Sequence, residues 1–171
     1  MANNDIRVIS SDYTVRTFPV DDRTTSGTGA TFKPGEPIKK GGASTNFVVL
    51  LATGEPTQTS AVFIGIVSRE STETSSAEGY VEAKVVKGGT ELEGLASTAA
   101  NFDTQSEIDD LIGHGILFDY DGTNFTIDEN DTDDLDVNGL VIVGGDPVKS
   151  IVYVQVHAGV TLSGTRTTVS Q

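Results

Sequence analysis

Short apolar segments separated by turn-forming residues most limit the folds open to this sequence. The runs Phe47–Ala52 and Val62–Val67 are rich in Val, Ile and Phe, and Gly, Pro, Ser and Thr bound them. Apolar runs of this length and composition are typical of β-strands. Between Phe32 and Val81 the chain consists largely of such strands and of turns, with few reactive side chains. That pattern favours a protein that presents a binding surface over one that catalyses a reaction.

The same pattern continues along the chain and predicts a mainly β fold. Proline follows Gly-Glu or Gly-Asp at positions 37, 56 and 147, beside predicted strands. Because proline has no N–H to donate, it ends or borders a β-ladder. The predicted strands are Phe47–Ala52, Ala61–Ser68, Gly79–Lys87, Gly115–Tyr120, Asn124–Ile127, Leu140–Val143, Ile151–Val156 and Val160–Val169.

One short helix is predicted after residue 103. Thr104-Gln105-Ser106-Glu107 has the spacing of a capping box, in which the Thr104 hydroxyl accepts a hydrogen bond from the Glu107 amide. A glycine at 113 or 115 would end the helix, and its apolar face would consist of Ile108, Leu111 and Ile112. We expect residues 103–139 to form an elaboration of the body that contains this helix, a hairpin and an acidic loop.

Residues 1–31 differ in composition from the body, which we place at residues 32–171. Ile6–Ile9 and Tyr13–Phe18 have the composition of short strands, but Asp21–Thr31 is polar and has no periodicity. Such a segment buries too little apolar area to offset the entropy cost of ordering it. We therefore predict an extended N-terminal arm with a flexible hinge. Two edge strands of the main sheet followed by a long loop fit the same residues equally well.

Charge is unevenly distributed along the chain, whose formal net charge is −14. Residues 1–40 hold six basic and five acidic residues, so this part carries +1 and the remainder carries −15. We expect the near-neutral part to meet another surface while the acidic body faces water. The overall negative charge argues against binding to a phosphate backbone, which requires clustered Lys and Arg.

Composition also excludes other classes of site. The chain has no Cys, which removes disulfides, thiolate nucleophiles and zinc–thiolate sites, and two histidines are too few for a site of several imidazoles. No apolar run approaches the ~20 residues that span a bilayer, and the first residues lack the features of a signal peptide. We expect a soluble protein made in a cytoplasm, with no cofactor and with no nucleic-acid or membrane partner.

The segment Ile116–Thr123 resembles a catalytic motif. An apolar strand followed by Asp-x-Asp-Gly-Thr is similar to the first motif of haloacid-dehalogenase-like phosphohydrolases. The resemblance implies that Asp119 attacks phosphorus and that Asp121 acts as acid and base, with Mg²⁺ neutralising charge. However, Asp121-Gly122 between two alternating apolar segments is a strong β-hairpin signal. We predict the hairpin, with the phosphohydrolase as the alternative.

The acidic stretch Asp128–Gly139 is a second candidate site. Asp134-x-Asp136-x-Asn138-Gly139 matches the opening of a calcium-binding loop. The twelfth position is Gly145, where that pattern has a bidentate Glu. We predict a solvated acidic loop, with a calcium-binding adhesion or fibre module as the alternative.

Basic residues in the first part of the chain form a candidate partner-binding set. In the functional interpretation these cations pair with carboxylates of a larger assembly, while an aromatic ring fills a pocket there. Ordinary surface charge on loops explains the same residues equally well. The set consists of Arg16, Phe18, Arg23, Lys33, Lys39 and Lys40, and no catalytic, cofactor-binding or metal-binding residue is predicted.

Three segments resemble tailed-phage head decoration (cement) proteins. They are Lys33–Gly41, with a Gly-Glu-Pro turn before a strand, the apolar strand Phe63–Val67, and Ala77–Val81 with its Gly-Tyr-Val. The resemblance covers roughly residues 32–87. It implies a β-barrel-like or β-tulip-like body, commonly a homotrimer, on the outer surface of an icosahedral capsid. There it would hold neighbouring major capsid subunits together.

Residues and resemblance together therefore predict a mainly β protein. Its body would be a small β-barrel, a β-tulip-like fold or a sandwich, with one short α-helix and an extended N-terminal arm. The expected partners are the major capsid protein and copies of the chain itself, and the expected location is the outer surface of the virion.

Overall fold

A computed structural model describes residues 6–20, 31–41, 47–59, 62–72, 79–133 and 137–161 of the chain. Its single α-helix is α2 (Gln105–Leu111), and two 3₁₀ turns are η1 (Ala99–Asn101) and η2 (Ala158–Val160). The strands are β1 (Arg7–Val8), β2 (Thr14–Pro19), β3 (Thr31–Phe32), β4 (Pro37–Lys40), β5 (Val48–Leu50), β6 (Phe63–Arg69), β7 (Ser71–Thr72), β8 (Tyr80–Val85), β9 (Glu91–Leu95), β10 (Gly115–Tyr120), β11 (Phe125–Asp133), β12 (Leu140–Asp146) and β13 (Ile151–Val156).

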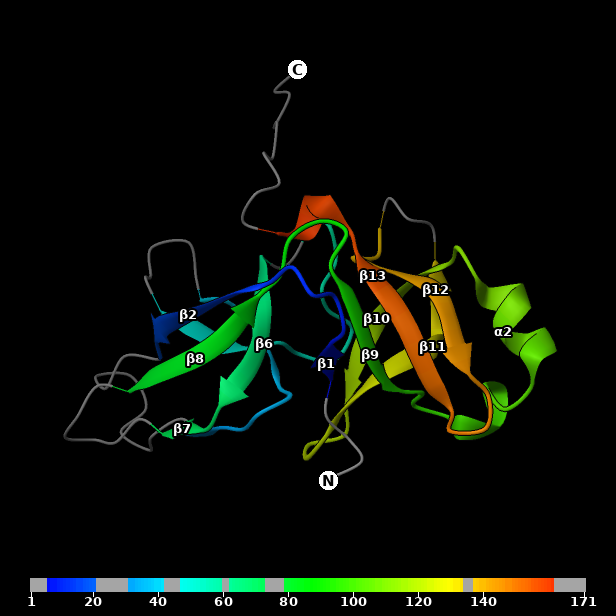
Figure 1. Ribbon diagram of the computed structural model, residues 1–171, viewed down its shortest axis with the longest axis horizontal. Coiled ribbons are helices and arrows are strands. Elements are labelled where there is room, and N and C mark those ends of the chain that lie inside the picture. The colour runs from blue at the N-terminus through cyan, green and yellow to red at the C-terminus, as the bar shows by residue number, and fades with distance from the viewer. Residues whose placement is uncertain are drawn as a thin grey trace, which may run out of the picture.

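Two antiparallel sheets make up most of the molecule and lie side by side (Figure 1). The six-stranded sheet has the order β1-β9-β13-β12-β10-β11, and the five-stranded sheet has the order β2-β8-β6-β4-β5. Helix α2 lies at the end of the six-stranded sheet that faces away from the five-stranded sheet. The mainly β fold with one short helix is confirmed, and the two sheets fit the sandwich form of the prediction.

The pairing of the described strands does not close either sheet into a barrel. A single parallel bridge between Val20 and Val48 nevertheless joins the two outer strands of the five-stranded sheet. A second hydrophobic cluster, separate from the main core, packs on this sheet and includes Phe32, Ile38, Ile64, Val67 and Val81.

The main hydrophobic core contains side chains from both sheets. Phe63 of β6 and Phe118 of β10 meet edge to face, with their ring centroids 5.7 Å apart. Residues 63–67 of β6 are all buried, because this central strand packs on the main core with one face and on the second cluster with the other. Burial on both faces explains why the sequence of β6 is continuously apolar instead of alternating.

Residues 6–20 do not form a separate arm, which corrects our prediction for this part of the chain. Strand β1 pairs with β9 at the edge of the six-stranded sheet, and β2 pairs with β8 at the edge of the five-stranded sheet. The physical reason is burial: Ile6 and Val8 are 1% and 9% exposed in the main core. The edge-strand interpretation is therefore the one that applies to residues 6–20, while residues 21–30, including Arg23, lie outside the described residues.

The predicted helix forms with its capping box. The Thr104 hydroxyl accepts from the Glu107 amide, and the Glu107 carboxylate accepts from the Thr104 amide. Ile108 is buried and Leu111 packs against the core, but Ile112 is 48% exposed. Ile112 was expected on the buried face; it is instead the C-cap, where the backbone leaves the helical conformation.

The predicted strands differ from the observed ones mainly at their ends. Strands β10 and β13 have the predicted bounds, β4 lies where the resemblance placed a strand after the Gly-Glu-Pro turn, and β3, β7 and β9 were missed. The prediction of a strand at Val160–Val169 is wrong for Val160, which belongs to η2; Thr161 then makes a parallel bridge with Phe63. Residues 162–169 lie outside the described part of the chain.

Candidate functional site

The Asp119/Asp121 segment forms the predicted hairpin between β10 and β11. The Asp121 carboxylate accepts hydrogen bonds from the backbone N–H groups of Thr123 at 2.7 Å and Asn124 at 2.8 Å. These bonds, that of Asn124 most strongly, lower the pKa of Asp121 below its ordinary value. Gly122 has a φ of 93°, in the left-handed region that glycine favours.

Both carboxylates of this hairpin accept hydrogen bonds from nearby backbone N–H groups. Asp119 accepts from the backbone N–H of Tyr120 at 2.8 Å, while Asp121 closes the turn. The strands on either side are antiparallel, whereas the phosphohydrolase alternative requires a doubly wound parallel sheet. The geometry of the hairpin therefore gives that alternative no support.

The calcium-loop motif lies only partly within the described residues. Asp134 and Asp136 lie outside them, and Asn138 is 2% exposed, with its side-chain amide donating to the Gly115 carbonyl at 3.0 Å. Asn138 therefore ties the start of β12 to β10. Across the described ranges, no group of three or more His, Cys, Asp or Glu side chains is placed to hold a metal ion.

Lys39 differs from the other predicted partner-binding cations because it is paired inside the molecule. Its ammonium donates to both carboxylate oxygens of Glu55, at 2.7 and 2.5 Å, and the two side chains are 22% and 13% exposed. Glu55 also accepts from the Ala52 amide, and its backbone bridges to Phe118 of β10. Lys39 thus links β4 of the five-stranded sheet to Glu55, whose backbone is bridged to β10 of the six-stranded sheet.

The remaining predicted residues are spread over the five-stranded half of the molecule. Arg16 is exposed on the edge strand β2, and Lys40 is exposed at the end of β4. Lys33 is exposed at the start of a turn that the Glu36 carboxylate closes by accepting from the Lys33 amide. Phe18 packs against the second hydrophobic cluster, so its ring contributes to the protein's own core instead of standing free for a partner.

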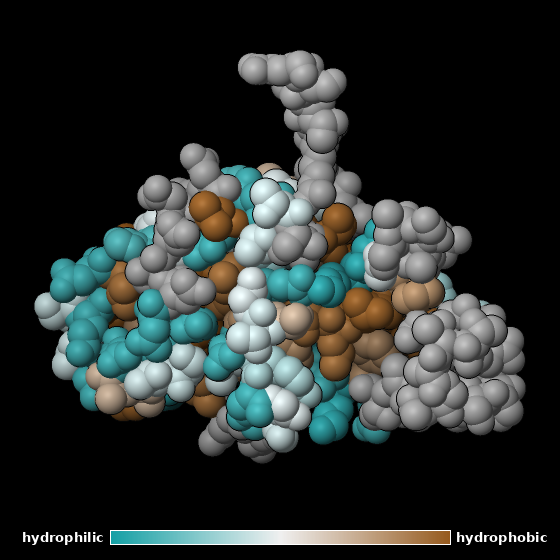
Figure 2. Space-filling view, turned by 180° about the vertical axis from the view of Figure 1, so that it is seen from behind, coloured by the Kyte–Doolittle hydropathy of each residue, from teal (hydrophilic) through white to brown (hydrophobic). Residues whose placement is uncertain are grey.

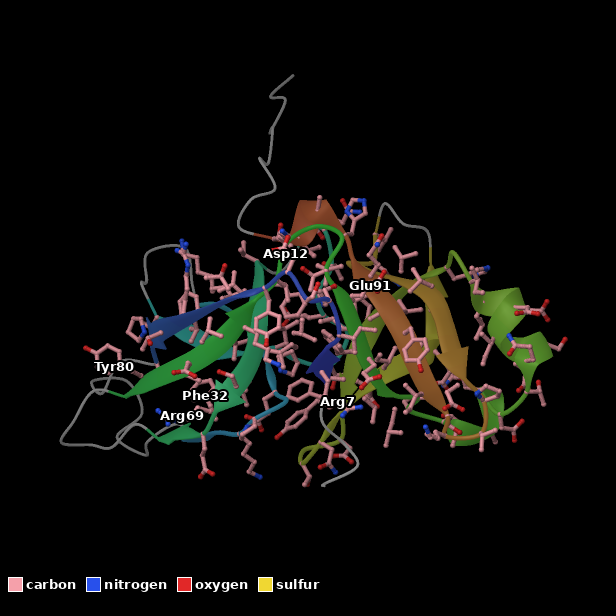
Figure 3. The ribbon with its side chains drawn as sticks, viewed as in Figure 1. Arg7, Asp12, Phe32, Arg69, Tyr80 and Glu91 are labelled. Carbon is pink, nitrogen blue, oxygen red and sulfur yellow. The ribbon has the colours of Figure 1, made fainter. Side chains whose placement is uncertain are left out.

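Charge divides along the chain, between the residues up to position 87 and those that follow. Up to residue 87, which includes every strand of the five-stranded sheet, the chain holds nine Lys and Arg and ten Asp and Glu residues. From residue 88 onward it holds two Lys and Arg and fifteen Asp and Glu residues. Seen from behind, hydrophilic residues cover the end that carries α2, and hydrophobic residues gather toward the other half (Figure 2). In Figure 3, Arg69 and Tyr80 lie in the five-stranded half.

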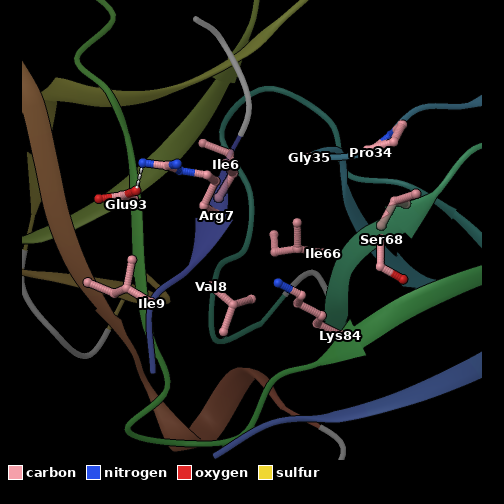
Figure 4. Close-up of a pocket in the computed structure, with 11 residues that line it drawn as sticks. Ile6, Arg7, Val8, Ile9, Pro34, Gly35, Ile66, Ser68, Lys84 and Glu93 are labelled. Carbon is pink, nitrogen blue, oxygen red and sulfur yellow. Dashed lines mark ion pairs between the residues drawn. The ribbon is translucent and has the colours of Figure 1, made fainter. Parts of the chain in front are cut away.

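A cleft of about 470 Å³ opens between the two sheets (Figure 4). Its walls come from β1 and the residues around it, from the turn at Pro34–Gly35, from β6 and from β8. Sequence reasoning missed this site, since its walls meet only when the first strand of the chain lies beside strands from residues 63–85. One sequence feature could have pointed to the cleft: a lysine at position 84, within a strand in which apolar and polar residues alternate.

No family model, no curated protein and no solved structure matches this chain. Among the described residues, no helix has both the length and the apolar character needed to cross a membrane.

Proposed function

We propose that this chain is a structural protein of a tailed-phage virion that binds the outer surface of the icosahedral capsid and stabilises contacts between major capsid subunits. The five-stranded half contacts the capsid, and the acidic six-stranded half faces the solvent. The chain acts by surface contact and catalyses no reaction.

The segments that carry the resemblance to decoration proteins support this proposal by their arrangement. Lys33–Gly41 contains β4, Phe63–Val67 lies in β6, and Ala77–Val81 leads into β8. These are three neighbouring strands of the five-stranded sheet. Segments that are far apart in the sequence thus form one continuous unit of the fold.

The division of charge between residues 1–87 and residues 88–171 is the observation on which the proposal mainly rests. A surface that approaches another protein loses its water, and unpaired charges make that loss costly. Residues 1–87, which include every strand of the five-stranded sheet, hold nearly balanced charges that can pair across an interface, whereas residues 88–171, with fifteen acidic and two basic residues, are better left in water. The polarity therefore favours one orientation on a larger assembly.

Cosedimentation with expanded, undecorated phage capsids tests this function. We expect the wild-type chain to bind, and we expect Arg16→Gln with Lys40→Gln to bind several-fold more weakly. The matched control is Ser106→Glu with Thr123→Glu, which lowers the net charge equally on exposed residues of the acidic half and leaves binding unchanged. Failure of the wild-type chain to bind over a range of salt concentrations, or equal losses in both variants, would contradict the proposal.

A further inference from the structure

The cleft between the sheets combines three features that a binding site for an extended peptide needs. They are a strand edge with backbone groups to pair, a cation that forms no ion pair with a described residue, and an apolar wall. Its volume of about 470 Å³ lies within the range of ligand-binding pockets. It lies apart from Arg16 and Lys40, which carry the test of the capsid proposal.

The strand edge is the side of β1 that faces away from β9. The Ile9 amide donates to the Glu91 carbonyl at 3.0 Å, toward β9, and the Ile6 amide donates to the Gly35 carbonyl at 3.2 Å on the opposite side. Because successive residues of an antiparallel strand alternate between the two sides, the N–H and C=O groups of Val8 point away from β9. Val8 lines the cleft, so an extended chain entering it can hydrogen-bond to these groups.

The cation is Lys84 of β8, which is half-buried and lies at the cleft wall. Its ammonium lies 4.6 Å from the centre of the Tyr13 ring and points into the space between Val8 and Ile66 (Figure 4). Arg7, Lys39 and Lys87 each pair with a carboxylate, but Lys84 forms no ion pair with any described residue. In a chain with 25 acidic residues, a half-buried ammonium without a carboxylate is a ready partner for an anion.

The apolar wall lies beside this cation. Ile66 of β6 is directly opposite Lys84 in the register of the five-stranded sheet, and Val8 faces both across the cleft. In an extended peptide, side chains two residues apart point to the same side. An acidic and an apolar side chain with that spacing can therefore reach Lys84 and Ile66 together.

We infer that this cleft binds an extended peptide segment of a partner protein with the pattern acidic-x-apolar. The peptide backbone pairs with the free edge of β1 and adds a strand to the six-stranded sheet. Its carboxylate binds the Lys84 ammonium, and its Val, Ile or Leu side chain enters the cleft beside Ile66 and Val8, which are 2% and 9% exposed there. This inference is independent of the capsid proposal.

Selection from a random hexapeptide library on the full-length chain tests the inference. We expect enrichment of Asp or Glu two positions from Val, Ile or Leu. Enriched peptides should bind Lys84→Met about tenfold or more weakly, as expected for loss of a charge-assisted hydrogen bond, and should keep their affinity for Lys84→Arg. The matched control Lys40→Met removes an exposed lysine outside the cleft and should bind like the wild-type chain.

Backbone pairing is tested separately with the best peptide after N-methylation of alternate amides, which keeps every side chain. Two such peptides are compared, one methylated at the amides that face Val8 and one at the other amides. We expect the first to bind at least tenfold more weakly, because it cannot donate to Val8. Enrichment without an acidic residue, equal affinity for Lys84→Met, or unchanged affinity of both methylated registers would each overturn the inference. The methylation result does not depend on the folding of any variant.

Discussion

Glu129 of β11 is 3% exposed, and its carboxylate accepts several hydrogen bonds. The Ser97 amide donates to it at 2.8 Å, the Ser97 hydroxyl at 3.1 Å and the Thr98 amide at 3.0 Å. We predict that Glu129→Ala lowers the free energy of unfolding by about 2–4 kcal/mol, because it removes a buried charged acceptor and leaves the amides of Ser97 and Thr98 without it. Urea unfolding followed by circular dichroism measures the change.

The control for this prediction is Asp110→Ala on the exposed face of α2. It removes one carboxylate from the same half of the molecule and should change the free energy of unfolding by no more than about 0.5 kcal/mol. Equal losses in the two variants would show that Glu129 contributes through net charge and not through its hydrogen bonds.

The hairpin carboxylate Asp121 is predicted to titrate below its ordinary range. Hydrogen bonds from the amides of Asn124 and Thr123 hold its pKa down in the folded chain. A lowered folded-state pKa means that this stabilisation is present above the unfolded-state pKa and is lost as the pH falls through the folded-state pKa. A carboxyl NMR titration measures the pKa directly, and a normal or raised value would contradict the hairpin geometry.

The same residue separates the structural interpretation from the catalytic one. Asp121→Asn should remove this part of the acid sensitivity of unfolding. We expect the wild-type chain not to hydrolyse an aryl phosphate, so Asp119→Asn should remove no activity. Hydrolysis of an aryl phosphate that disappears in Asp119→Asn would favour the phosphohydrolase alternative instead.

At the scale of whole elements, strands β6 and β8 approach so closely that Gly65 has no room for a side chain. A Cβ atom there would lie 2.2 Å from the Lys84 carbonyl oxygen. We predict that Gly65→Ala costs about 3 kcal/mol or more, because backbone atoms must move apart within a close-packed sheet. Thermal and urea unfolding measure the loss. Ile64→Val, next to it in β6, should cost only about 1 kcal/mol, and a similar small loss for Gly65→Ala would contradict the close approach.

Helix α2 depends on its capping box more than on its length of 7 residues. Thr104→Ala removes the hydroxyl that accepts from the Glu107 amide, and we predict a loss of about 1 kcal/mol in the free energy of unfolding. Ser106→Ala, at an exposed position in the first turn of the same helix, should change the free energy of unfolding by only a few tenths of a kcal/mol. Equal effects of the two substitutions would show that the cap adds nothing to stability.

Elements with a strong local signal could be predicted from the sequence, and elements without one could not. The bounds of β10 and β13 follow from apolar runs that end at turn residues, and the start of α2 follows from Thr104 and Glu107. Strand β9 was missed because three of its five residues, Glu91, Glu93 and Gly94, are of types that strands disfavour. Gly94 belongs there because its absent Cβ makes room for Ile6 from the other end of the sequence.

The candidate site could be predicted only in part, for the same reason. The exposure of Arg16, Lys33 and Lys40 agrees with a surface role, but the pairing of Lys39 with Glu55 depends on tertiary contacts that no local pattern encodes. The cleft depends on β1 lying beside β6 and β8, so Lys84 and Val8 could not be brought together from sequence spacing.

At the scale of the whole molecule, the two sheets share one main core. Leu51, Phe63 and Ile66 of the first part of the chain pack in the same cluster as Phe118 and Val154 of the second part. We predict that residues 88–171 alone do not fold cooperatively, since they lack these side chains and the edge strand β1. A thermal melt followed by near-ultraviolet circular dichroism tests this, with the full chain as the control. A sharp transition in the fragment would mean that the sheets are separate folding units.

We also predict that the chain forms a homotrimer in solution, as the resemblance to decoration proteins implies. Light scattering coupled to size-exclusion chromatography should give three times the 17.9 kDa of one chain. Exposed β edges are protected from aggregation when they pair across a symmetric assembly. A monomeric mass at all concentrations would argue against the capsid proposal and would leave the peptide-binding cleft unaffected.

The pairing of β1 with β9 also sets an order of events during translation. Ile6–Ile9 leaves the ribosome long before its partner Glu91–Leu95 has been synthesised, so half of the protein must be made before the first strand can dock. Until then Ile6 and Val8, which are 1% and 9% exposed in the folded chain, stay in water, and apolar surface exposed in this way is prone to aggregation. Such long-range closure slows folding, because the entropy cost of closing the loop is paid before the contacts between β1 and β9 form.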